Sequence, residues 1–251
     1  MIQRLNKYLA QQGIASRRAA DRLIVEGRVS VNRRIVEDLG VKVDPETDKI
    51  AVDGKGVSAS HELLYLMLHK PVGCLVTKDD PEGRPTVMDL IPKLKAPVFP
   101  VGRLDYNSEG LLLLTNDGEL AYRLTHPRYE IVKKYAVQVT GEITPADAAR
   151  LEKGVYVEGR RTAPARIKIF ERSARRTILL IDIHEGRKRE VRQMLEAIGH
   201  PVQTLKRVEF AGLRLAPLAY GKWRFLKKQE VLRLKQQVRL LRPKPGSSAS
   251  A

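Results

Sequence analysis

The sequence predicts an α+β protein of two unequal domains followed by a short disordered tail. Its 251 residues suit this division, because single hydrophobic cores usually stop growing at a few hundred residues. Residues 1–60 combine helical spacing with strand-like alternation, whereas residues 61–242 carry apolar strands broken by Pro and Gly. The second pattern is typical of a sheet-rich domain rather than a helical bundle. Residues 243–251 are rich in Pro, Gly, Ser and Ala and are expected to be disordered.

The smaller domain begins with two predicted helices. Leu5, Tyr8 and Leu9 share one helical face and indicate the first of them. Ser16 has the residue type of an N-cap, so we expect the second helix to begin there and to end at Gly27. Two helices packed on the strands that follow are therefore expected.

Alternating apolar residues predict the strands of the smaller domain. They are Val29, Val31, Val41, Val43, Ile50 and Val52. Asp53-Gly54 has the composition of a tight turn between strands. We expect the domain boundary just beyond this turn, near residues 58–60.

The larger domain contains several predicted strands and one clear helix. Tyr135, Val137 and Val139 alternate with more polar residues, which indicates a half-buried antiparallel strand. Ile178–Ile183 is a more continuous apolar run, and we expect it at the centre of the sheet. Four apolar residues at helical spacing then predict a helix: Val191, Met194, Leu195 and Ile198.

Charge indicates the kind of partner. With 46 Lys and Arg against 29 Asp and Glu, the net charge is +17, which favours a polyanion such as nucleic acid. A basic chain also suits anionic membranes, but apolar runs such as Leu111–Leu114 are far too short to span a bilayer. The amino terminus lacks the apolar core of a secretory signal, so we expect a cytoplasmic protein without a membrane partner.

Several kinds of site are disfavoured. Cys74 is the only cysteine, which excludes an intramolecular disulfide and, in practice, a cysteine-based zinc site. The five histidines lack the spacing of metal ligands, so we expect no metal. The sequence has no P-loop, no dinucleotide-binding glycine pattern and no Gly-x-Ser-x-Gly motif, and we therefore expect no cofactor.

One polar turn carries the strongest chemical signal. Gly102–Gly110 contains Asp105 and is followed directly by the apolar run Leu111–Leu114. A carboxylate held there needs a nearby cation to remain ionised, and Arg103 and Arg192 are candidates. Residue type and spacing alone favour a simpler interpretation, in which Asp105 opens an Asx-turn before a buried strand.

Motifs along nearly the whole chain resemble a known family. The quoted segments are Gly102-Arg103-Leu104-Asp105, Gly110–Gly118, His69–Gly73, Asp80–Val87, Lys134-Tyr135 and Glu185–Met194. Together they resemble the bacterial ribosomal small-subunit and large-subunit pseudouridine synthases of the RsuA/RluB branch. This resemblance implies a mixed, mainly antiparallel sheet and a reaction that consumes nothing. In that reaction the bond from N1 of a uridine to C1′ breaks, the uracil turns over, and it rejoins through C5.

The resemblance also implies roles for four side chains. Asp105 matches the essential catalytic carboxylate, and Tyr135 matches the tyrosine that stacks on the uracil and can transfer a proton. Arg192 matches the basic residue that pairs with the carboxylate, and Arg103 the arginine that helps to hold the target nucleotide out of its helix. Apart from the resemblance, Tyr135 is more simply a core aromatic residue and Arg192 a solvated side chain.

The amino-terminal domain resembles an S4 RNA-binding domain. The matching segments are Arg4–Ala10, Ser16-Arg17-Arg18 and Gly27–Asn32, although Asn32-Arg33-Arg34 stands where members often have Asn-Gly. Arg17 and Arg18 lie in the first turn of a helix, where positive charge is disfavoured unless an anion binds there; the alternative is a solvated basic face. The RNA contacts we expect in the whole chain are Arg4, Lys7, Arg17, Arg18, Arg28, Asn32, Arg103, Arg187, Lys188 and Arg189.

The expected partner is ribosomal RNA. The segment Asp80–Val87 favours the large-subunit members of the family, which act on 23S rRNA, and a 16S rRNA enzyme is the alternative within the class. A non-catalytic RNA-binding protein of ribosome assembly would need only the S4-like domain and the charge, and a DNA-binding regulator fits less well because strands follow the first helices. We expect a monomer.

Overall fold

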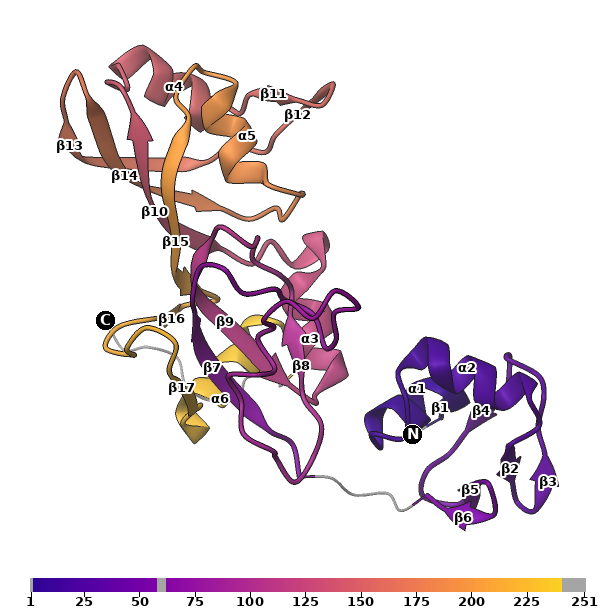
Figure 1. Ribbon diagram of the computed structural model, residues 1–251. Coiled ribbons are helices and arrows are strands. Elements are labelled where there is room, and N and C mark those ends of the chain that lie inside the picture. Colours follow the sequence, from indigo (N-terminus) through magenta and orange to yellow (C-terminus); the bar gives the residue numbers. More distant parts are fainter. Residues whose placement is uncertain (1, 58–61, 241–251) are drawn as a thin grey trace, which may run out of the picture. The chain divides into compact units, whose positions relative to one another are not determined.

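The computed structural model describes residues 2–57 and 62–240 and contains two compact units (Figure 1). The smaller unit comprises Met1–Leu64 with two short segments, Leu94–Val98 and Asn116–Gly118. The larger unit comprises the rest of the chain. The architecture is α+β, as predicted. The expected boundary near residues 58–60 and the expected tail at residues 243–251 lie outside the described residues.

The smaller unit packs two helices beside short strands. Its elements are β1 (Gln3–Arg4), α1 (Leu5–Gln11), α2 (Arg17–Val25), β2 (Val29–Val31), β3 (Arg34–Ile35), β4 (Lys42–Val43), β5 (Ile50–Val52) and β6 (Lys55–Gly56). The strands form a four-stranded sheet in the order β3-β2-β5-β6 and a separate β1-β4 pair. The core residues come from both helices and from three strands: Leu5, Tyr8, Leu9, Ala20, Ile24, Val29, Val43 and Ile50.

Local signals of the smaller unit behave as predicted. The Ser16 side chain accepts a hydrogen bond from the Ala19 N–H and caps α2. Asp53 and Gly54 adopt φ of 49° and 74° and join β5 to β6 in a tight hairpin. The cap and the turn therefore follow from residues close in sequence.

The turn between β2 and β3 departs from the usual glycine. Asn32 and Arg33 have φ of 51° and 67°, in the left-handed region that favours Gly. Asn32 tolerates this conformation, and its side chain bonds Asp48 and the Lys49 N–H at 2.9 Å each. The Arg33 side chain bonds none of the described residues, so the turn keeps its hairpin shape at the cost of backbone strain.

The larger unit is built on one sheet with helices packed against it. Its strands are β7 (Tyr65–Lys70), β8 (Phe99–Val101), β9 (Glu109–Thr115), β10 (Lys133–Thr140), β11 (Tyr156–Val157), β12 (Arg160–Arg161), β13 (Arg166–Arg172), β14 (Arg176–Ile183), β15 (Val202–Phe210), β16 (Leu213–Arg214) and β17 (Trp223–Phe225). Its helices are α3 (Gly118–Thr125), η1 (Pro127–Tyr129), α4 (Pro145–Lys153), α5 (Glu190–Glu196) and α6 (Lys228–Gln237).

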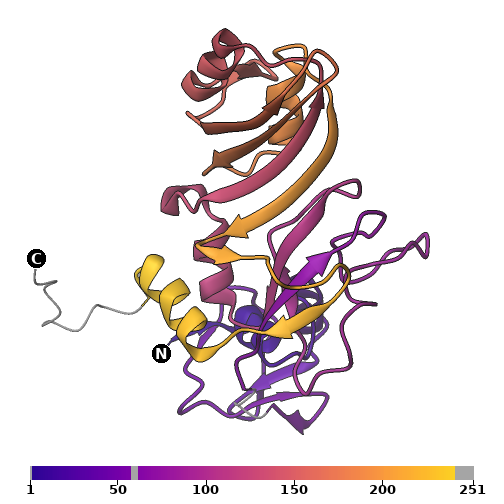
Figure 2. The same cartoon turned by 90° about the vertical axis from the view of Figure 1, so that its left-hand side faces the viewer.

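The main sheet runs in the order β13-β14-β10-β15-β9-β7-β17, and β8 and β16 pair with β9 and β15. All of its pairings are antiparallel except that between β15 and β9, so the sheet is mixed and mainly antiparallel, as expected. The long strands β10 and β15 curve between the two halves of the unit (Figure 2).

The expected position of Ile178–Ile183 is wrong. These residues form most of β14, which lies second from one edge of the sheet, between β13 and β10. Leu179 and Ile181 are buried under α4 and α5, whereas Ile178 and Leu180 are only partly covered. The apolar run therefore predicted a strand that is paired on both sides, but it did not predict how far that strand lies from the edge of the sheet.

Two cores divide the larger unit. One packs β10, β14 and β15 against α4 and α5, and the other packs β7 and β9 against α3 and α6. The β9-β15 pairing joins the two halves and involves only two residue pairs, Lys206 with Glu109 and Arg207 with Gly110. Gly110 has φ of 119°, and a Cβ there would overlap the main chain of Arg207. Only glycine fits this junction, where the polar turn enters β9.

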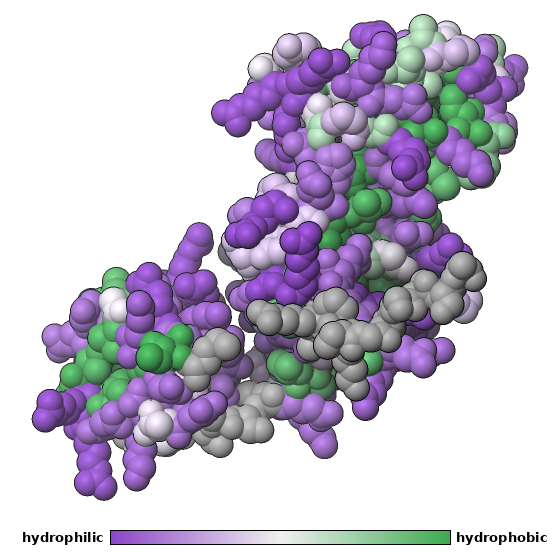
Figure 3. Space-filling view, turned by 180° about the vertical axis from the view of Figure 1, so that it is seen from behind, coloured by the Kyte–Doolittle hydropathy of each residue, from purple (hydrophilic) through white to green (hydrophobic). Residues whose placement is uncertain are grey.

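Hydrophilic side chains cover most of the face of each unit seen in Figure 3. None of the helices in the described part of the chain has both the length and the apolar character that crossing a bilayer requires.

Candidate active site

A pocket of about 160 Å³ opens in the larger unit beside the β9-β15 junction. The polar turn forms one wall, β10 and β15 contribute another, and the segment entering α5 closes it. Its lining includes Arg103, Asp105, Ser108, Thr125, Lys133, Tyr135, Arg187, Arg189, Glu190 and Arg207. Asp105 and Tyr135, thirty positions apart in sequence, thus line one cavity.

Asp105 is half-buried on the polar turn. Its main-chain oxygen accepts a hydrogen bond from the Ser108 N–H at 3.1 Å, which closes the turn. Among the described residues, no group donates a hydrogen bond to its carboxylate or lies within ion-pair distance of it. The Asx-turn interpretation is therefore wrong, and the carboxylate faces the pocket available for a substrate.

Three buried cations hold the main chain around Asp105. Lys70 Nζ donates to the Ser108 oxygen at 2.8 Å, and Arg192 Nη2 donates to the Asn107 oxygen at 2.8 Å. From β15, the Arg207 Nε donates to the oxygen of Leu111, the first leucine of β9, at 2.7 Å. The three cations come from β7, α5 and β15, and each is less than 10% exposed. They place positive charge around the turn without occupying the carboxylate.

Arg192 occupies a different place from the one we expected. It is 7% exposed, so the solvated interpretation is wrong. It lies behind the turn, where it lines a second cavity with Asn107 and Lys206 rather than the pocket of Asp105. Burial and the nearby Arg189 lower the pKa of its guanidinium, while the charge of Asp105 opposes that shift. Arg192 therefore acts on Asp105 through its charge and through the main chain of the turn, which it bonds at Asn107.

Tyr135 and Lys133 project from the same face of β10 into the pocket. Tyr135 is 8% exposed and also packs in the core, so the core interpretation and the pocket interpretation both describe it. Lys133 Nζ donates to the oxygens of Ile131 and His184 at 2.8 and 3.2 Å. Burial, reinforced by the charge of Arg207, lowers the pKa of Lys133 to about 8. The pocket therefore places a buried amine beside the tyrosine.

Glu190 adds a second carboxyl group to the pocket. It is 5% exposed, and its Oε2 accepts a hydrogen bond from the Arg187 N–H at 3.1 Å. Burial raises the pKa of Glu190 to about 7, and the neighbouring carboxylate of Glu185 adds to the rise. Glu190 therefore holds a proton far more tightly than an exposed glutamate does.

The remaining expected contacts of the larger unit lie at the pocket's rim. Arg103, Arg187 and Arg189 are exposed and line the pocket, and Lys188 is exposed between them. Arg187 is engaged within the protein, because its guanidinium lies 3.2 Å from Glu185 and donates to the Arg161 oxygen. Arg103, Lys188 and Arg189 make no ion pair with any described residue.

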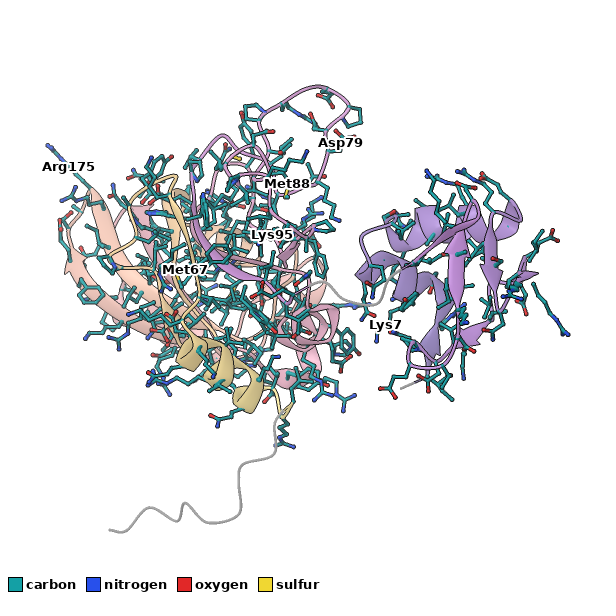
Figure 4. The ribbon with its side chains drawn as sticks, turned by 90° about the horizontal axis from the view of Figure 1, so that it is seen from below. Lys7, Met67, Asp79, Met88, Lys95 and Arg175 are labelled. Atoms are coloured by element: carbon teal, nitrogen blue, oxygen red, sulfur yellow. The ribbon has the colours of Figure 1, made fainter. Side chains whose placement is uncertain are left out.

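The expected contacts of the smaller unit divide into two groups. Arg17 and Arg18 are exposed on α2. Lys7, labelled in Figure 4, is partly exposed on α1. The other three side chains have partners inside the protein. Arg4 donates to the Leu39 oxygen, Arg28 forms a bidentate pair with Asp53, and Asn32 bonds Asp48 and Lys49.

Sequence reasoning missed three residues of the pocket, namely Lys133, Glu190 and Arg207. Lys133 had a usable signal, because it stands two positions before Tyr135 and so faces the same side of a strand. Glu190 lies inside a recognised segment, but its burial has no local signal. Arg207 is a basic residue in an alternating strand, and only strand pairing brings it to the pocket. In the described part of the chain, no group of three or more His, Cys, Asp or Glu could hold a metal ion.

A pocket with a free carboxylate, a buried tyrosine and a rim of arginines suits a polyanionic substrate. The fold and the site thus define an enzyme that acts on nucleic acid. Comparison with known proteins gives the family. The family model described as RNA pseudouridylate synthase matches residues 64–197, and the S4 domain model matches residues 3–50. The chain belongs to the RNA pseudouridylate synthase family and is an RNA pseudouridine synthase with an amino-terminal S4 domain.

Several relatives are similar over nearly their whole length. An uncharacterized RNA pseudouridine synthase of Aquifex aeolicus is 46% identical over 94% of this chain and 95% of its own. Ribosomal large subunit pseudouridine synthase B of Bacillus subtilis is 46% identical over 93% of this chain and 96% of its own. A solved crystal structure of a pseudouridylate synthase is 30% identical, superimposes with a TM-score of 0.68, and covers 92% of this chain and 99% of that one.

Proposed function

We propose that this enzyme converts a uridine of 23S ribosomal RNA to pseudouridine, with Asp105 as the catalytic carboxylate. The observation that carries the chemistry is the shared pocket of Asp105 and Tyr135, in which the carboxylate has no partner among the described residues. The choice of RNA rests on the relatives named ribosomal large subunit pseudouridine synthase B, from Bacillus subtilis and Pseudomonas aeruginosa. It also rests on the large-subunit resemblance of Asp80–Val87.

Asp105 acts at the sugar in this proposal. Either of two routes, attack of the carboxylate on C1′ or removal of the 2′ proton, requires an ionised group there. Lys70, Arg192 and Arg207 place positive charge at the turn and at the start of β9 by donating to the oxygens of Ser108, Asn107 and Leu111. Because they bond main-chain oxygens, both carboxylate oxygens remain available to the substrate.

Tyr135 and the buried amine act at the base. The tyrosine ring supplies a flat apolar surface for the uracil, and its hydroxyl can take part in moving the C5 proton once the new C5–C1′ bond has formed. Uracil carries negative charge while it is detached from the sugar. The positive charges of Lys133 and Arg207, both lining the pocket, oppose that cost.

The S4 domain and the pocket's rim bind the RNA backbone. Arg17, Arg18 and Lys7 are our candidates for phosphate contacts in the smaller unit, and Arg103, Lys188 and Arg189 in the larger one. Arg103 also helps to hold the uridine out of its helix. Four other expected contacts reach RNA only if their partners inside the protein release them: Arg4, Arg28, Asn32 and Arg187. We therefore expect these four to contribute less to RNA binding.

The test is to map pseudouridines in ribosomal RNA from cells with and without this protein. One 23S position should lose its modification, and the wild-type gene should restore it. The Asp105→Asn variant should not restore it, because the amide keeps the size of the side chain but cannot act as a carboxylate; turnover should fall by ~10³-fold or more. Loss of a 16S position instead would contradict the assignment to 23S rRNA, and restoration by Asp105→Asn would contradict the role of Asp105.

A further inference from the structure

Three aromatic rings gather at the end of α3, and at least one of them is exposed to solvent. The Tyr122 and His126 ring centroids lie 5.0 Å apart, and each lies about 6.5 Å from Tyr129, at 6.5 and 6.4 Å respectively. Tyr129 packs partly against the core of α3 and α6, whereas Tyr122 is 47% exposed. We call these three residues the ring cluster. Its outer ring presents apolar area to solvent, and its inner ring anchors it.

Two arginines flank the ring cluster. The Arg128 guanidinium lies 5.2 Å from the Tyr129 ring centroid, and that of Arg123 lies 5.7 Å from it. Arg123 is engaged with Glu119 at 2.8 Å. Arg128 is exposed and forms no ion pair with any residue of the described part of the chain. The cluster therefore combines exposed ring area with one available positive charge.

The ring cluster lies beside Thr125, a residue that lines the pocket of Asp105. Thr125 lines that pocket, and a Cβ placed on Gly102 of the polar turn would lie 3.3 Å from its methyl group. Tyr122 stands three positions before Thr125, and His126 follows Thr125 directly. The His126 N–H donates to the Tyr122 oxygen at 2.9 Å, so both residues belong to the last turn of the helix. Residues three apart share one side of a helix, so Tyr122 lies beside Thr125.

The chemistry of this surface fits an unpaired base attached to a phosphate. Aromatic side chains stack on the faces of bases whatever the base, and a neighbouring arginine can bind the phosphate. An RNA whose uridine is turned into the pocket leaves adjacent bases without a stacking partner. A protein partner would not need a cation beside the rings, and a simple helix-stabilising pair would not need Tyr122 half exposed.

We propose that the ring cluster binds the base of a nucleotide next to the target uridine, with Tyr122 as the stacking surface and Arg128 on its phosphate. This proposal rests on the proposed function, because it places the target uridine in the pocket of Asp105. It adds a second base-binding site to the enzyme. The site recognises any flat base, and its task is to keep the flanking strand open while the uridine is inside the pocket.

The test uses a 23S rRNA fragment that the wild-type chain converts, with each nucleotide beside the target uridine replaced in turn by an abasic residue. Tyr122→Ala should raise the Kd of the intact fragment about tenfold, since 1.4 kcal/mol, within the range for one stacked base, corresponds to that factor. Tyr122→Phe should bind like the wild type because the ring is kept. With the correct abasic fragment, Tyr122→Ala should cause no further loss of affinity.

Tyr156→Ala is the matched control, because Tyr156 is 73% exposed on β11 and does not line the pocket. It should leave the Kd unchanged. Equal Kd values for Tyr122→Ala and the wild type, or equal losses on intact and abasic fragments, would overturn the ring-cluster proposal. If Tyr122→Ala changed only the thermal unfolding, the proposal would likewise be overturned, since the rings would then only stabilise the helix. If the wild type converts no 23S fragment, the proposed function fails instead.

Discussion

The two units of this protein differ in whether they bury basic residues. In the described part of the smaller unit every Lys and Arg is at least partly exposed, and Arg17 and Arg18 stand in the first turn of a helix. Among the described residues of the larger unit four cations are buried, namely Lys70, Lys133, Arg192 and Arg207, and each donates to main-chain oxygens. The same net charge of +17 thus serves two tasks. Outward cations such as Arg17 and Arg18 are available to phosphate, whereas the inward cations Lys70, Arg192 and Arg207 bond the main chain of the catalytic turn and of β9.

The largest expected effect comes from removing an inward cation. Lys70→Met fills the same space but leaves the oxygens of Pro71 and Ser108 without their donor, at about 1–3 kcal/mol for each buried acceptor. We expect the free energy of unfolding to fall by about 2–5 kcal/mol and conversion to fall at least tenfold. Denaturant unfolding and a conversion assay measure both. Lys188→Met removes an exposed cation from the same unit and should change stability very little, so equal losses for the two variants would break the comparison.

The buried Glu190 should make the stability of the larger unit depend on pH, which distinguishes its buried groups from the exposed ones. Its pKa is about 7 in the folded chain against an ordinary 4.5, so the folded state binds this proton more tightly than the unfolded state. The corresponding stability is fully present below pH 4.5 and is lost as the pH rises through 7. Glu190→Gln cannot titrate, so the variant should gain about 1–3 kcal/mol over the wild type between pH 5 and pH 8. Unfolding curves at both values measure this, and Glu196→Gln, changed at an exposed site of α5, should show no such gain.

Outward cations should show the opposite profile. Changing Arg17 and Arg18 to Gln should weaken binding to structured rRNA and reduce the magnitude of the log-log salt slope by somewhat under two, at about 0.7–0.9 per contact. Conversion at saturating RNA should change little. Affinity at several salt concentrations, measured beside thermal unfolding, separates this from a solvated face. An unaltered salt slope together with a slightly higher thermal stability would mean that the two arginines only destabilise the start of the helix and do not bind RNA.

The smallest effect concerns the strained turn of the smaller unit. Arg33 has φ of 67°, a conformation that is costly for a side chain with a Cβ and easy for glycine. Arg33→Gly should therefore raise the free energy of unfolding by about 0.5–1 kcal/mol. Arg34→Gly, one residue later in β3, has no strain to relieve and should lower it. A loss of stability in Arg33→Gly would show that the side chain contributes more than its backbone costs.

Features that depend on near neighbours were accessible from the sequence. Ser16 caps α2 because its hydroxyl reaches an N–H three residues away, and Asp53-Gly54 turns the chain because its two residues tolerate positive φ. Asp105 and Tyr135 came from matching motifs rather than from spacing. The structure adds that they line one pocket, which residue type alone had not favoured.

Features that depend on strand order were not accessible. Ile178–Ile183 is a strand as predicted, yet its place second from the sheet's edge depends on β13 pairing beyond it. Arg192 was expected at the carboxylate, and the structure places it at the Asn107 oxygen behind the turn. A local pattern gives which side of an element is buried. It does not give which other element covers that side.

The sequence by itself thus determined the fold class, the charge, the caps and turns, and, by resemblance, the motif that carries Asp105. The tertiary structure alone decided that Lys70, Arg192 and Arg207, up to 137 positions apart in numbering, reach oxygens at the end of the polar turn and at the start of β9. The physical reason is that a buried cation is tolerated only where acceptors meet it. The acceptors are close in sequence, but their donors come from β7, α5 and β15, and no spacing within any one of these elements encodes that they meet.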